Sequence, residues 1–284
     1  MPDTTLTHES TSRYVDTRSW RLHYNEAGSG HPVIMLHGSG AGATGWSNFA
    51  PNIPALAERF RVIALDAPGW GRSQPGLPEV YDHPNAVLEL MDALGIERAA
   101  LVGNSMGGST AITFASRYPD RISHLVTMGA GSLMEIPTMF GAGDGPSEGL
   151  KILFQAYREP TLENMTRVAE IMTFDASKAT RELAQQRLDN ALAHPEHLQN
   201  FLTGLATGGP VRNRATQPEI ANITAPTLLI HGRDDRVVSY EYSLRILPMI
   251  ADSRLVLLNR CGHWAQLEHA EEFNRLVADF IQHG

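Results

Sequence analysis

Ser105 lies in the segment Gly103-Asn104-Ser105-Met106-Gly107, which matches the pattern Gly-x-Ser-x-Gly. The segment follows a predicted strand at residues 99–102 and precedes a predicted helix at residues 106–117. A serine on a tight strand-to-helix turn projects its hydroxyl outward, and the flanking glycines leave room for the backbone of the turn. The same segment also fits an ordinary glycine-rich turn whose serine caps the helix, so a nucleophilic Ser105 needs further groups around it.

Two more residues supply the partners that a serine nucleophile requires. A serine hydroxyl is a weak nucleophile near neutral pH, so it needs a base and a group that orients the base. His263 follows the predicted strand at residues 254–258, and Asp235 follows the one at residues 226–230. The chain order Ser, Asp, His after strand ends is that of α/β hydrolases. These residues predict a serine hydrolase with Ser105 as nucleophile, His263 as general base and Asp235 as the orienter of the base.

A glycine-rich loop offers a place for the negative charge that develops on an attacked carbonyl oxygen. The loop, His37-Gly38-Ser39-Gly40-Ala41-Gly42, follows a predicted strand at residues 32–36. Such a loop can aim a backbone N–H at the oxyanion, and the residue after the nucleophile supplies a second one. We expect Ser39 and Met106 to be these donors. Without the triad, the loop would equally fit an ordinary turn before a helix.

The order of the predicted elements indicates the fold class. Short apolar runs predict buried strands, and helical patterns alternate with them. The strands are predicted at residues 32–36, 61–65, 99–102, 122–128, 226–230 and 254–258, and the helices at residues 85–94, 106–117, 240–247 and 270–281. This alternation predicts an α/β protein with a doubly wound, mostly parallel sheet. Residues 19–24 predict an antiparallel strand ahead of it.

One long stretch of the chain interrupts this alternation. Residues 134–214 carry no strand pattern and instead predict helices, at residues 151–157, 162–172, 180–191 and 196–202. An insertion at this point can fold over the carboxyl ends of the strands, where open α/β sheets bind ligands. We therefore expect an α/β-hydrolase core made of residues 1–133 and 215–284, with residues 134–214 as an inserted helical cap.

Composition disfavours several classes of protein. The chain has 23 Lys and Arg against 31 Asp and Glu, a formal net charge of −8 and no basic run, which argues against a nucleic-acid or anionic-membrane partner. Cys261 is the single cysteine, so the chain can form no intrachain disulfide, and this is consistent with a reducing compartment. No signal-peptide pattern opens the sequence, and no apolar run suits a membrane span. We expect a cytoplasmic protein.

The histidines also raise the question of a metal site. His194 and His197 lie three residues apart with Glu196 between them. Pro195 is expected to interrupt a helix there, and no further ligand is evident, so we expect neither a metal nor a cofactor. Cys261 is expected to pack behind the proposed base rather than to react.

With these motifs in place, the chain resembles the meta-cleavage product hydrolases, bacterial enzymes of aromatic and steroid catabolism. These enzymes hydrolyse a carbon–carbon bond in 2-hydroxy-6-oxo-hexa-2,4-dienoates. The resemblance runs nearly end to end, and its most specific segments are Trp46-Ser47-Asn48 and Cys261-Gly262-His263-Trp264-Ala265-Gln266. It also covers residues 9–13, 37–49, 103–108, 195–198, 232–237 and 268–270. The family pattern selects Asp235 over its neighbour Asp234 as the triad acid.

The resemblance implies which residues hold the substrate. Asn48, Asn104, Arg187 and Trp264 correspond to the groups that bind its carboxylate and enol oxygen. A guanidinium can hold a planar carboxylate through two parallel hydrogen bonds, and Arg187 would supply positive charge despite the acidic composition. Taken alone, an arginine in a predicted helix more commonly faces solvent. The resemblance also implies a homodimer or higher homo-oligomer.

The implied reaction has two stages. The anionic dienoate first ketonises, with His263 as a plausible proton shuttle, and this turns the conjugated chain into an electron sink. Ser105 then attacks the 6-oxo carbonyl, the 2-hydroxypentadienoate fragment leaves, and water clears the acyl enzyme. A serine-activated gem-diol would be the other route to the same products.

Some positions depart from the family pattern. Ala41 stands where the family usually has proline, and Ser39 where many members have glycine, but neither change removes a backbone N–H. Residues 206–217, including Gly208-Gly209-Pro210, match poorly, and we expect substrate choice to be decided there and along residues 134–154.

Two other functions stay open. One is a carboxylesterase or related acyl hydrolase with the same triad, and the other is a ligand receptor on an inactive hydrolase fold. Haloalkane dehalogenases and epoxide hydrolases are disfavoured because they carry an aspartate at the position that Ser105 occupies.

Overall fold

The computed structural model describes residues 6–76, 81–132, 138–139, 145–207 and 214–284. In this part of the chain the strands form one eight-stranded sheet in the order β1-β2-β4-β3-β5-β6-β7-β8. β1 and β2 pair antiparallel, β2 and β4 pair antiparallel, and every other neighbouring pair is parallel. The strands are β1 (Ser12–Asp16), β2 (Arg21–Ala27), β3 (Pro32–Leu36), β4 (Arg61–Leu65), β5 (Ala99–Asn104), β6 (Ile122–Met128), β7 (Thr227–Gly232) and β8 (Ser253–Leu258).

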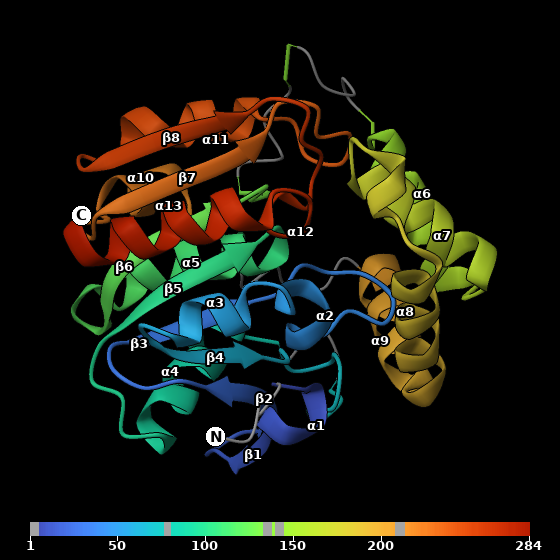
Figure 1. Cartoon of the computed structure of the whole chain (residues 1–284), viewed down its shortest axis with the longest axis horizontal. Coiled ribbons are helices and arrows are strands. Elements are labelled where there is room, and N and C mark those ends of the chain that lie inside the picture. Colours follow the sequence, from blue (N-terminus) through green and yellow to red (C-terminus); the bar gives the residue numbers. More distant parts are fainter. Residues whose placement is uncertain (1–5, 77–80, 133–137, 140–144, 208–213) are drawn as a thin grey trace.

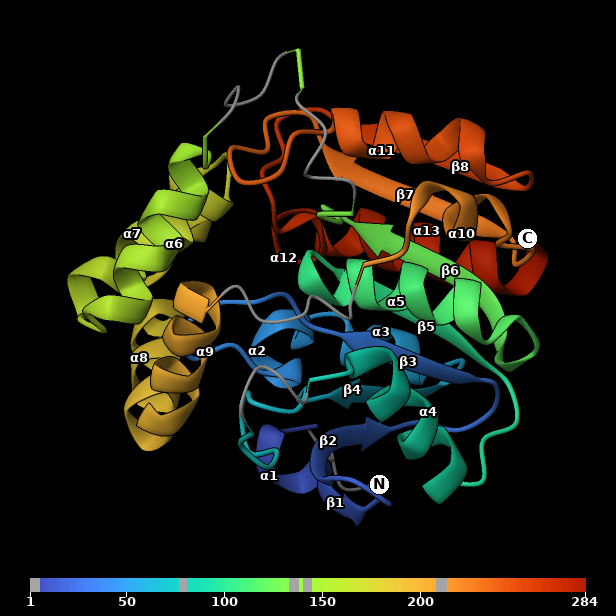
Figure 2. The same ribbon diagram turned by 180° about the vertical axis from the view of Figure 1, so that it is seen from behind.

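Helices cover both faces of this sheet (Figures 1 and 2). On one face lie α2 (Gly45–Phe49), α3 (Ile53–Ala57), α12 (Ala265–Glu268) and α13 (Ala270–His283), and on the other lie α4 (His83–Ala93), α5 (Met106–Arg117), α10 (Gln217–Ala221) and α11 (Glu241–Ile246). A short helix, α1 (His8–Thr11), precedes β1. The alternation of side chains along a strand feeds two apolar clusters: Val33 and Met35 of β3 pack on one face, Ile34 and Leu36 on the other.

The expected fold class is confirmed. All six predicted core strands and the four helices predicted between them are present, with ends shifted by a few residues. The antiparallel strand expected at residues 19–24 is β2. The sequence did not predict β1, because its residues alternate only weakly and most of them are exposed.

Of the described helices between β6 and β7, those that precede α10 stand together at the carboxyl ends of the parallel strands (Figure 1). They are α6 (Glu148–Arg158), α7 (Leu162–Met172), α8 (Arg181–Ala193) and α9 (Pro195–Thr207). Each corresponds to one of the predicted helices. Residue 134 and the segment Gly208-Gly209-Pro210 lie outside the described residues, so the division into core and cap stays a prediction. No helix in the described ranges is both long and apolar enough to cross a membrane.

Candidate active site

Ser105 occupies the turn between β5 and α5 in a strained backbone conformation. Its φ is 53° and its ψ is −113°, a backbone conformation that residues other than glycine rarely adopt. The glycines beside it are required by space. A Cβ on Gly103 would lie 2.3 Å from the carbonyl oxygen of Gly107, and one on Gly107 would lie 2.0 Å from that of Leu36. The Gly-x-Ser-x-Gly pattern therefore reflects a turn that presses the backbone of α5 against β3 and β5.

A second segment, Gly145-Pro146-Ser147-Glu148-Gly149, also fits the Gly-x-Ser-x-Gly pattern. Ser147 has an ordinary φ of −58° and is the N-cap of α6. Its hydroxyl accepts a hydrogen bond from the Leu150 amide at 3.2 Å and donates one to the carbonyl of Val237 at 2.8 Å. The Ser147 hydroxyl caps the start of α6, and the residue has an ordinary backbone conformation. Of the two Gly-x-Ser-x-Gly segments, only the one around Ser105 forms the strained turn between a strand and a helix.

The Asp235 carboxylate and the His263 imidazole are hydrogen-bonded. His263 Nδ1 lies 2.7 Å from Asp235 Oδ2, and the amides of Val237 and Val238 donate to Oδ1 at 2.7 and 2.9 Å. Burial would raise the pKa of the Asp235 carboxyl, but the neighbouring His263 and the hydrogen bond from His231 outweigh it and hold that pKa well below its usual range. An ionised carboxylate only accepts, so Nδ1 carries the proton and Nε2 of His263 is left free to act as a base.

Asp234 lies in a different environment from Asp235. Its side chain is 28% exposed and faces the guanidinium of Arg233 at 3.4 Å, whereas the Asp235 side chain is fully buried. The geometry thus agrees with the choice of Asp235 as the orienter.

Ser105 and His263 approach the same short segment at the end of β6. The Ser105 amide donates to the carbonyl of Met128 at 2.8 Å. The next residue, Gly129, has a φ of +56°, and a Cβ there would lie 2.8 Å from His263 Cε1. Asn104 Nδ2 bridges the same parts of the fold, reaching the carbonyls of Met128 at 3.4 Å and His263 at 3.3 Å.

The glycine-rich loop is held from two sides. Asn48 Oδ1 accepts a hydrogen bond from the Gly38 amide at 3.3 Å, and the Tyr157 hydroxyl accepts one from the Gly40 amide at 2.9 Å. Among the described residues the amide of Ser39, between these two, has no hydrogen-bond partner. A Cβ on Gly38 would lie 3.1 Å from Ser105 Cβ, so the loop borders the nucleophile. This arrangement suits an oxyanion donor at Ser39.

Arg187 of α8 is buried, and its guanidinium has no hydrogen-bond or ion-pair partner among the described residues. The residue is 1% exposed, Nε has no hydrogen-bond partner, and no carboxylate of the described part of the chain pairs with it. Its guanidinium carbon sits 5.1 Å from the ring centre of Trp264, and Nη2 lies 2.4 Å from where a Cβ of Gly40 would be. Burial lowers the pKa of Arg187 to about 10, so the group stays charged at neutral pH. A buried cation without a partner is costly, and an anion bound there would relieve the cost.

The four expected substrate-binding residues are all buried, but they differ in which of their polar atoms lack a hydrogen-bond partner. Asn104 Oδ1 has no partner among the described residues, whereas Oδ1 of Asn48 is committed to the glycine-rich loop. The Asn48 amide nitrogen is therefore the part of that side chain available to a ligand. Trp264 contributes an apolar ring against Arg187.

The structure also shows contacts that the sequence did not predict. Besides Gly40, the Tyr157 hydroxyl accepts a hydrogen bond from Trp70 Nε1 at 3.3 Å, and burial raises the pKa of this phenol. His231 shares Asp235 with the proposed base, with Nε2 at 3.2 Å from Oδ2. Neither Tyr157 nor His231 lies in a sequence motif that would have predicted these contacts.

A second Ser–His–Asp arrangement joins the first residue of β1, a residue within β2 and the residue that follows β4. Ser12 Oγ is 2.8 Å from His23 Nε2, and His23 Nδ1 is 2.7 Å from Asp66 Oδ2. Asp66 also accepts hydrogen bonds from the amides of Gly45 at 2.7 Å and Arg72 at 2.9 Å. Ser12 lies on an ordinary strand without a glycine-rich loop beside it, so this group ties β1 and β2 to the start of α2.

The residues considered for a metal lie near one another. Ligand atoms of His194, Glu196 and His197 are within 4.8 Å of one another. The expected interruption of the helix is present, because α8 ends at Ala193 and α9 begins at Pro195. His197 Nε2 also lies 3.2 Å from the carbonyl of Gly71. Cys261 is fully buried, and burial raises the pKa of its thiol, in keeping with a packing role.

Comparisons with known proteins agree with one another. Residues 31–270 match the family model described as the alpha/beta hydrolase fold. The chain is 45% identical to a 2-hydroxy-6-oxononadienedioate/2-hydroxy-6-oxononatrienedioate hydrolase of Paraburkholderia xenovorans, over 98% of both chains. It is 43% identical to a 2-hydroxy-6-oxo-6-phenylhexa-2,4-dienoate hydrolase of Comamonas testosteroni, over 98% of this chain and 99% of that one. Among solved structures, a meta-cleavage product hydrolase from Pseudomonas fluorescens superposes with a TM-score of 0.82 at 33% identity, covering 95% of this chain and 97% of that one.

Proposed function

Because the chain belongs to the meta-cleavage product hydrolases of the α/β-hydrolase fold, we propose that its substrate is a 2-hydroxy-6-oxo-hexa-2,4-dienoate from aromatic ring fission. The observation that carries this proposal is the buried, unpaired guanidinium of Arg187 beside the glycine-rich loop. An ester hydrolase acting on neutral substrates has no use for such a charge. A dienoate carries a carboxylate that would pair with it.

Binding places the two ends of the substrate. The carboxylate pairs with Arg187, and at the same end of the substrate Asn104 Oδ1 and the amide nitrogen of Asn48 bind the neighbouring enol hydroxyl, while the 6-oxo carbonyl is the other end. This leaves the 6-oxo carbonyl toward Ser105 and the amides of Ser39 and Met106. His263, whose Nε2 is free, first moves the proton that converts the dienol to the ketone.

Cleavage follows on the ketonised substrate. His263 takes the hydroxyl proton of Ser105, and the serine oxygen attacks the 6-oxo carbon. The oxyanion rests on the backbone amides of Ser39 and Met106 at the start of α5, whose dipole favours negative charge. When the tetrahedral intermediate collapses, the carbon–carbon bond breaks, its electron pair enters the keto-activated chain, and His263 returns the proton. Water then hydrolyses the acyl enzyme.

An Arg187→Ala variant tests the substrate class. We expect kcat/KM for a dienoate to fall by at least two orders of magnitude, while hydrolysis of a small neutral ester changes little, because only the dienoate needs the cation. Arg181→Ala is a matched control: Arg181 lies on the same helix, α8, and is exposed. Equal losses on both substrates would favour a general carboxylesterase.

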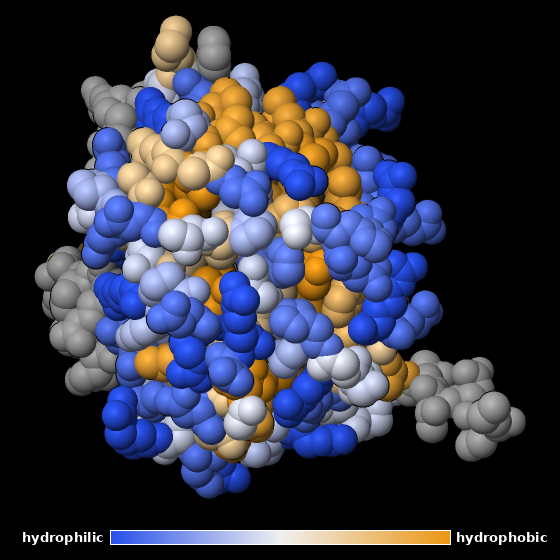
Figure 3. Space-filling view, turned by 90° about the vertical axis from the view of Figure 1, so that its left-hand side faces the viewer, coloured by the Kyte–Doolittle hydropathy of each residue, from blue (hydrophilic) through white to orange (hydrophobic). Residues whose placement is uncertain are grey.

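We also propose that residues 134–214 act as a cap over the core, and that the protein works in the cytoplasm as a homodimer or larger homo-oligomer. The location is supported by Cys261 being a free thiol. The assembly is supported by the edge of the sheet: β8 has a neighbour on one side only and carries Leu257, which is 41% exposed. Apolar side chains gather at the upper end of that side of the molecule, where β8 and α11 lie (Figure 3).

A further inference from the structure

The loop that carries His263 is bound directly to the cap. The amides of His263 and Trp264 donate to the carbonyl of Met172, at 2.7 and 3.1 Å. Met172 is the last residue of α7, and the final carbonyls of a helix have no partner within the helix. A Cβ on Gly262 would lie 2.6 Å from this same carbonyl oxygen, so the contact also requires glycine there.

The Glu268 carboxylate joins the same two segments from the other side. Oε1 accepts hydrogen bonds from the amides of Phe174 at 2.9 Å and Asp175 at 2.7 Å, which follow α7. Oε2 accepts one from the amide of Gly262 at 2.8 Å. Hydrogen bonds to a charged acceptor are roughly twice as strong as neutral ones, so this carboxylate is a firm link between the cap and the loop of His263.

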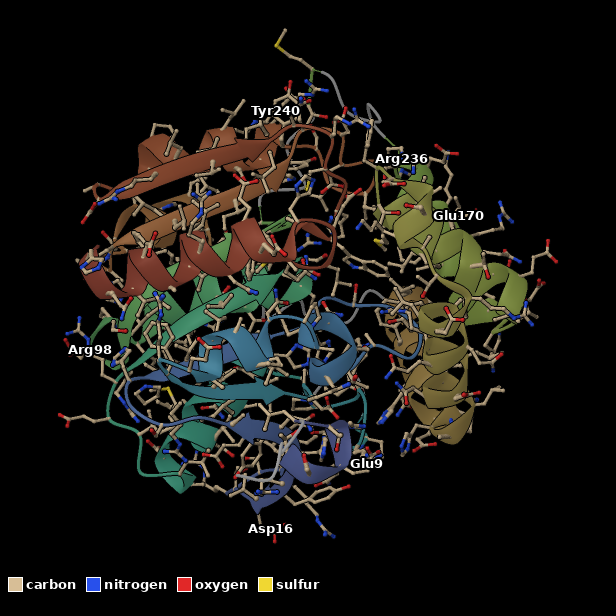
Figure 4. The ribbon with its side chains drawn as sticks, in the orientation of Figure 1. Glu9, Asp16, Arg98, Glu170, Arg236 and Tyr240 are labelled. Atoms are coloured by element: carbon tan, nitrogen blue, oxygen red, sulfur yellow. The ribbon has the colours of Figure 1, made fainter. Side chains whose placement is uncertain are left out.

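The loop that carries Asp235 reaches the same stretch of the cap. Arg236 Nη2 donates to the carbonyl of Glu170 at 2.7 Å and to that of Thr173 at 3.1 Å. Figure 4 shows Arg236 and Glu170 near one another at the junction of core and cap. Residues 170–175 thus hold both loops of the proposed acid–base pair.

We propose that Glu268 is a positioning residue that sets the placement of His263 through the Gly262 amide and the cap segment after α7. The carboxylate accepts hydrogen bonds from backbone amides of the cap segment and of the loop that carries His263. Its role is therefore to fix the distance between the two segments. This inference rests on the proposed role of His263 as the base for Ser105. A displacement of about 1 Å at a reacting group can cost about 100-fold in rate, so a loosened loop should slow every step that uses His263.

The test is the rate at which a fluorophosphonate labels Ser105, measured across pH on folded protein and mapped to the Ser105 peptide. Glu268→Gln keeps the shape but places an amide N–H against at least one backbone N–H, so at least one of the three hydrogen bonds is lost. We expect labelling to slow by about 10- to 100-fold, with a changed pH profile. Glu271→Gln, an exposed carboxylate on α13, is the matched control and should label as the wild type does.

The outcomes are distinguishable. If Glu268→Gln unfolds at a lower temperature but labels at the wild-type rate and with the wild-type pH profile, Glu268 is only a stabilising contact and the inference is overturned. If the wild type does not label at Ser105, the proposed triad fails and the positioning role falls with it. Should the Gln variant not fold, Glu268→Asp keeps the charge and shortens the reach by one methylene, and the same comparison applies.

Discussion

At the scale of single residues, the proposed chemistry depends on one carboxylate serving two histidines. Asp235 Oδ2 lies between His263 Nδ1 and His231 Nε2, while Oδ1 is held by two backbone amides. His231 is in turn fixed by Ser243 Oγ at 2.7 Å from its Nδ1. The two backbone amides and His231 therefore fix the position of the Asp235 carboxylate, and the fixed carboxylate can orient His263.

Replacing Asp235 by Asn should remove most of the activity without unfolding the protein. The Asn amide would donate to His263 Nδ1, which forces the other tautomer and puts a proton on Nε2, where the base must be free. We expect kcat to fall by about 10³- to 10⁴-fold. Steady-state kinetics on a dienoate measures this. Asp234→Asn, the neighbouring control, should stay within a few-fold of the wild type, and the reverse ranking would exchange the roles of the two aspartates.

The sequence could predict Ser105, His263 and an acid at position 234 or 235 because each follows a recognisable strand and the turn around Ser105 requires glycine. The family resemblance then selected Asp235 over Asp234. Tyr157 and Glu268 could not be predicted in the same way. Most of their partners are backbone amides far away in the chain, those of Gly40 for Tyr157 and of Phe174 and Asp175 for Glu268, and an amide leaves no mark on residue type. Only the folded structure brings Glu268 to the residues that follow α7.

At the scale of elements, helix α8 lies against the glycine-rich loop. Gly42 has a φ of +68°, and a Cβ there would lie 1.9 Å from the carbonyl oxygen of Arg187. This close approach brings the helix that carries the guanidinium against the loop that contains Ser39, the proposed oxyanion donor. The position of Arg187 therefore depends on a glycine that its own sequence neighbourhood does not reveal.

Gly42→Ala should impair substrate binding more than it impairs folding elsewhere. The new methyl group would push α8 away from the loop and displace Arg187, so KM for a dienoate should rise by about tenfold or more. Gly95 is a matched control, since its φ is +65° and no atom lies within 4 Å of its Cβ position. Gly95→Ala should cost about 1 kcal/mol of backbone strain and leave KM unchanged. Equal kinetic effects would show that the contact with α8 is unimportant.

Glu89 anchors the turn between β1 and β2 to α4. Its carboxylate accepts hydrogen bonds from Thr17 Oγ1 at 2.9 Å, the Ser19 amide at 2.9 Å and Ser19 Oγ at 2.8 Å, and it pairs with Arg18 at 3.0 Å. Burial raises the pKa of the Glu89 carboxyl, but these hydrogen bonds lower it by more than burial raises it. The pKa therefore lies below the usual 4.5. The ionised form therefore stabilises the folded state.

This lowered pKa gives a dependence of stability on pH. The stabilisation by Glu89 is fully present above pH 4.5 and is lost as the pH falls through the lower folded-state pKa. Glu89→Gln should cost about 1–3 kcal/mol near neutral pH, and the difference from the wild type should shrink below pH 4.5. Urea unfolding at several pH values measures it. The exposed Glu97→Gln serves as control, and a difference that did not change with pH would argue against an ionised Glu89.

The sequence predicted most elements because their apolar spacing is set by burial on a sheet or under a helix. α7 appears at the residues expected, 162–172, because an apolar face runs its whole length and Thr161 caps its start. β1 was missed because an exposed edge strand has no buried face to impose a pattern.

At the scale of the whole molecule, the two edges of the sheet differ. The β1 edge exposes Arg13 and Asp16 beside Tyr14, whereas the β8 edge exposes Leu257 and Arg254 and partly exposes Leu255 and Val256. An apolar edge strand with unpaired backbone groups tends to be covered by another chain. This difference places the proposed contact between copies at β8.

Leu257→Lys should therefore weaken the assembly. A charged side chain on an edge strand opposes pairing with a second chain. We expect the variant to dissociate at concentrations where the wild type is dimeric or larger, as measured by light scattering. Leu192→Lys, at a residue 58% exposed on α8, is the control and should not change the mass. An unchanged mass for Leu257→Lys would exclude β8 as the interface.

The most direct test of the central claim is a single-turnover reaction of the wild type and a Ser105→Ala variant with a 2-hydroxy-6-oxo-dienoate, followed by absorbance and by product analysis. The account predicts that the wild type releases a carboxylic acid and a 2-hydroxypentadienoate in equal amounts. It predicts that the Ala variant binds and ketonises the dienoate, through Arg187 and His263, but leaves the carbon–carbon bond intact. Cleavage by the Ala variant at the wild-type rate, or no cleavage by the wild type, would contradict it.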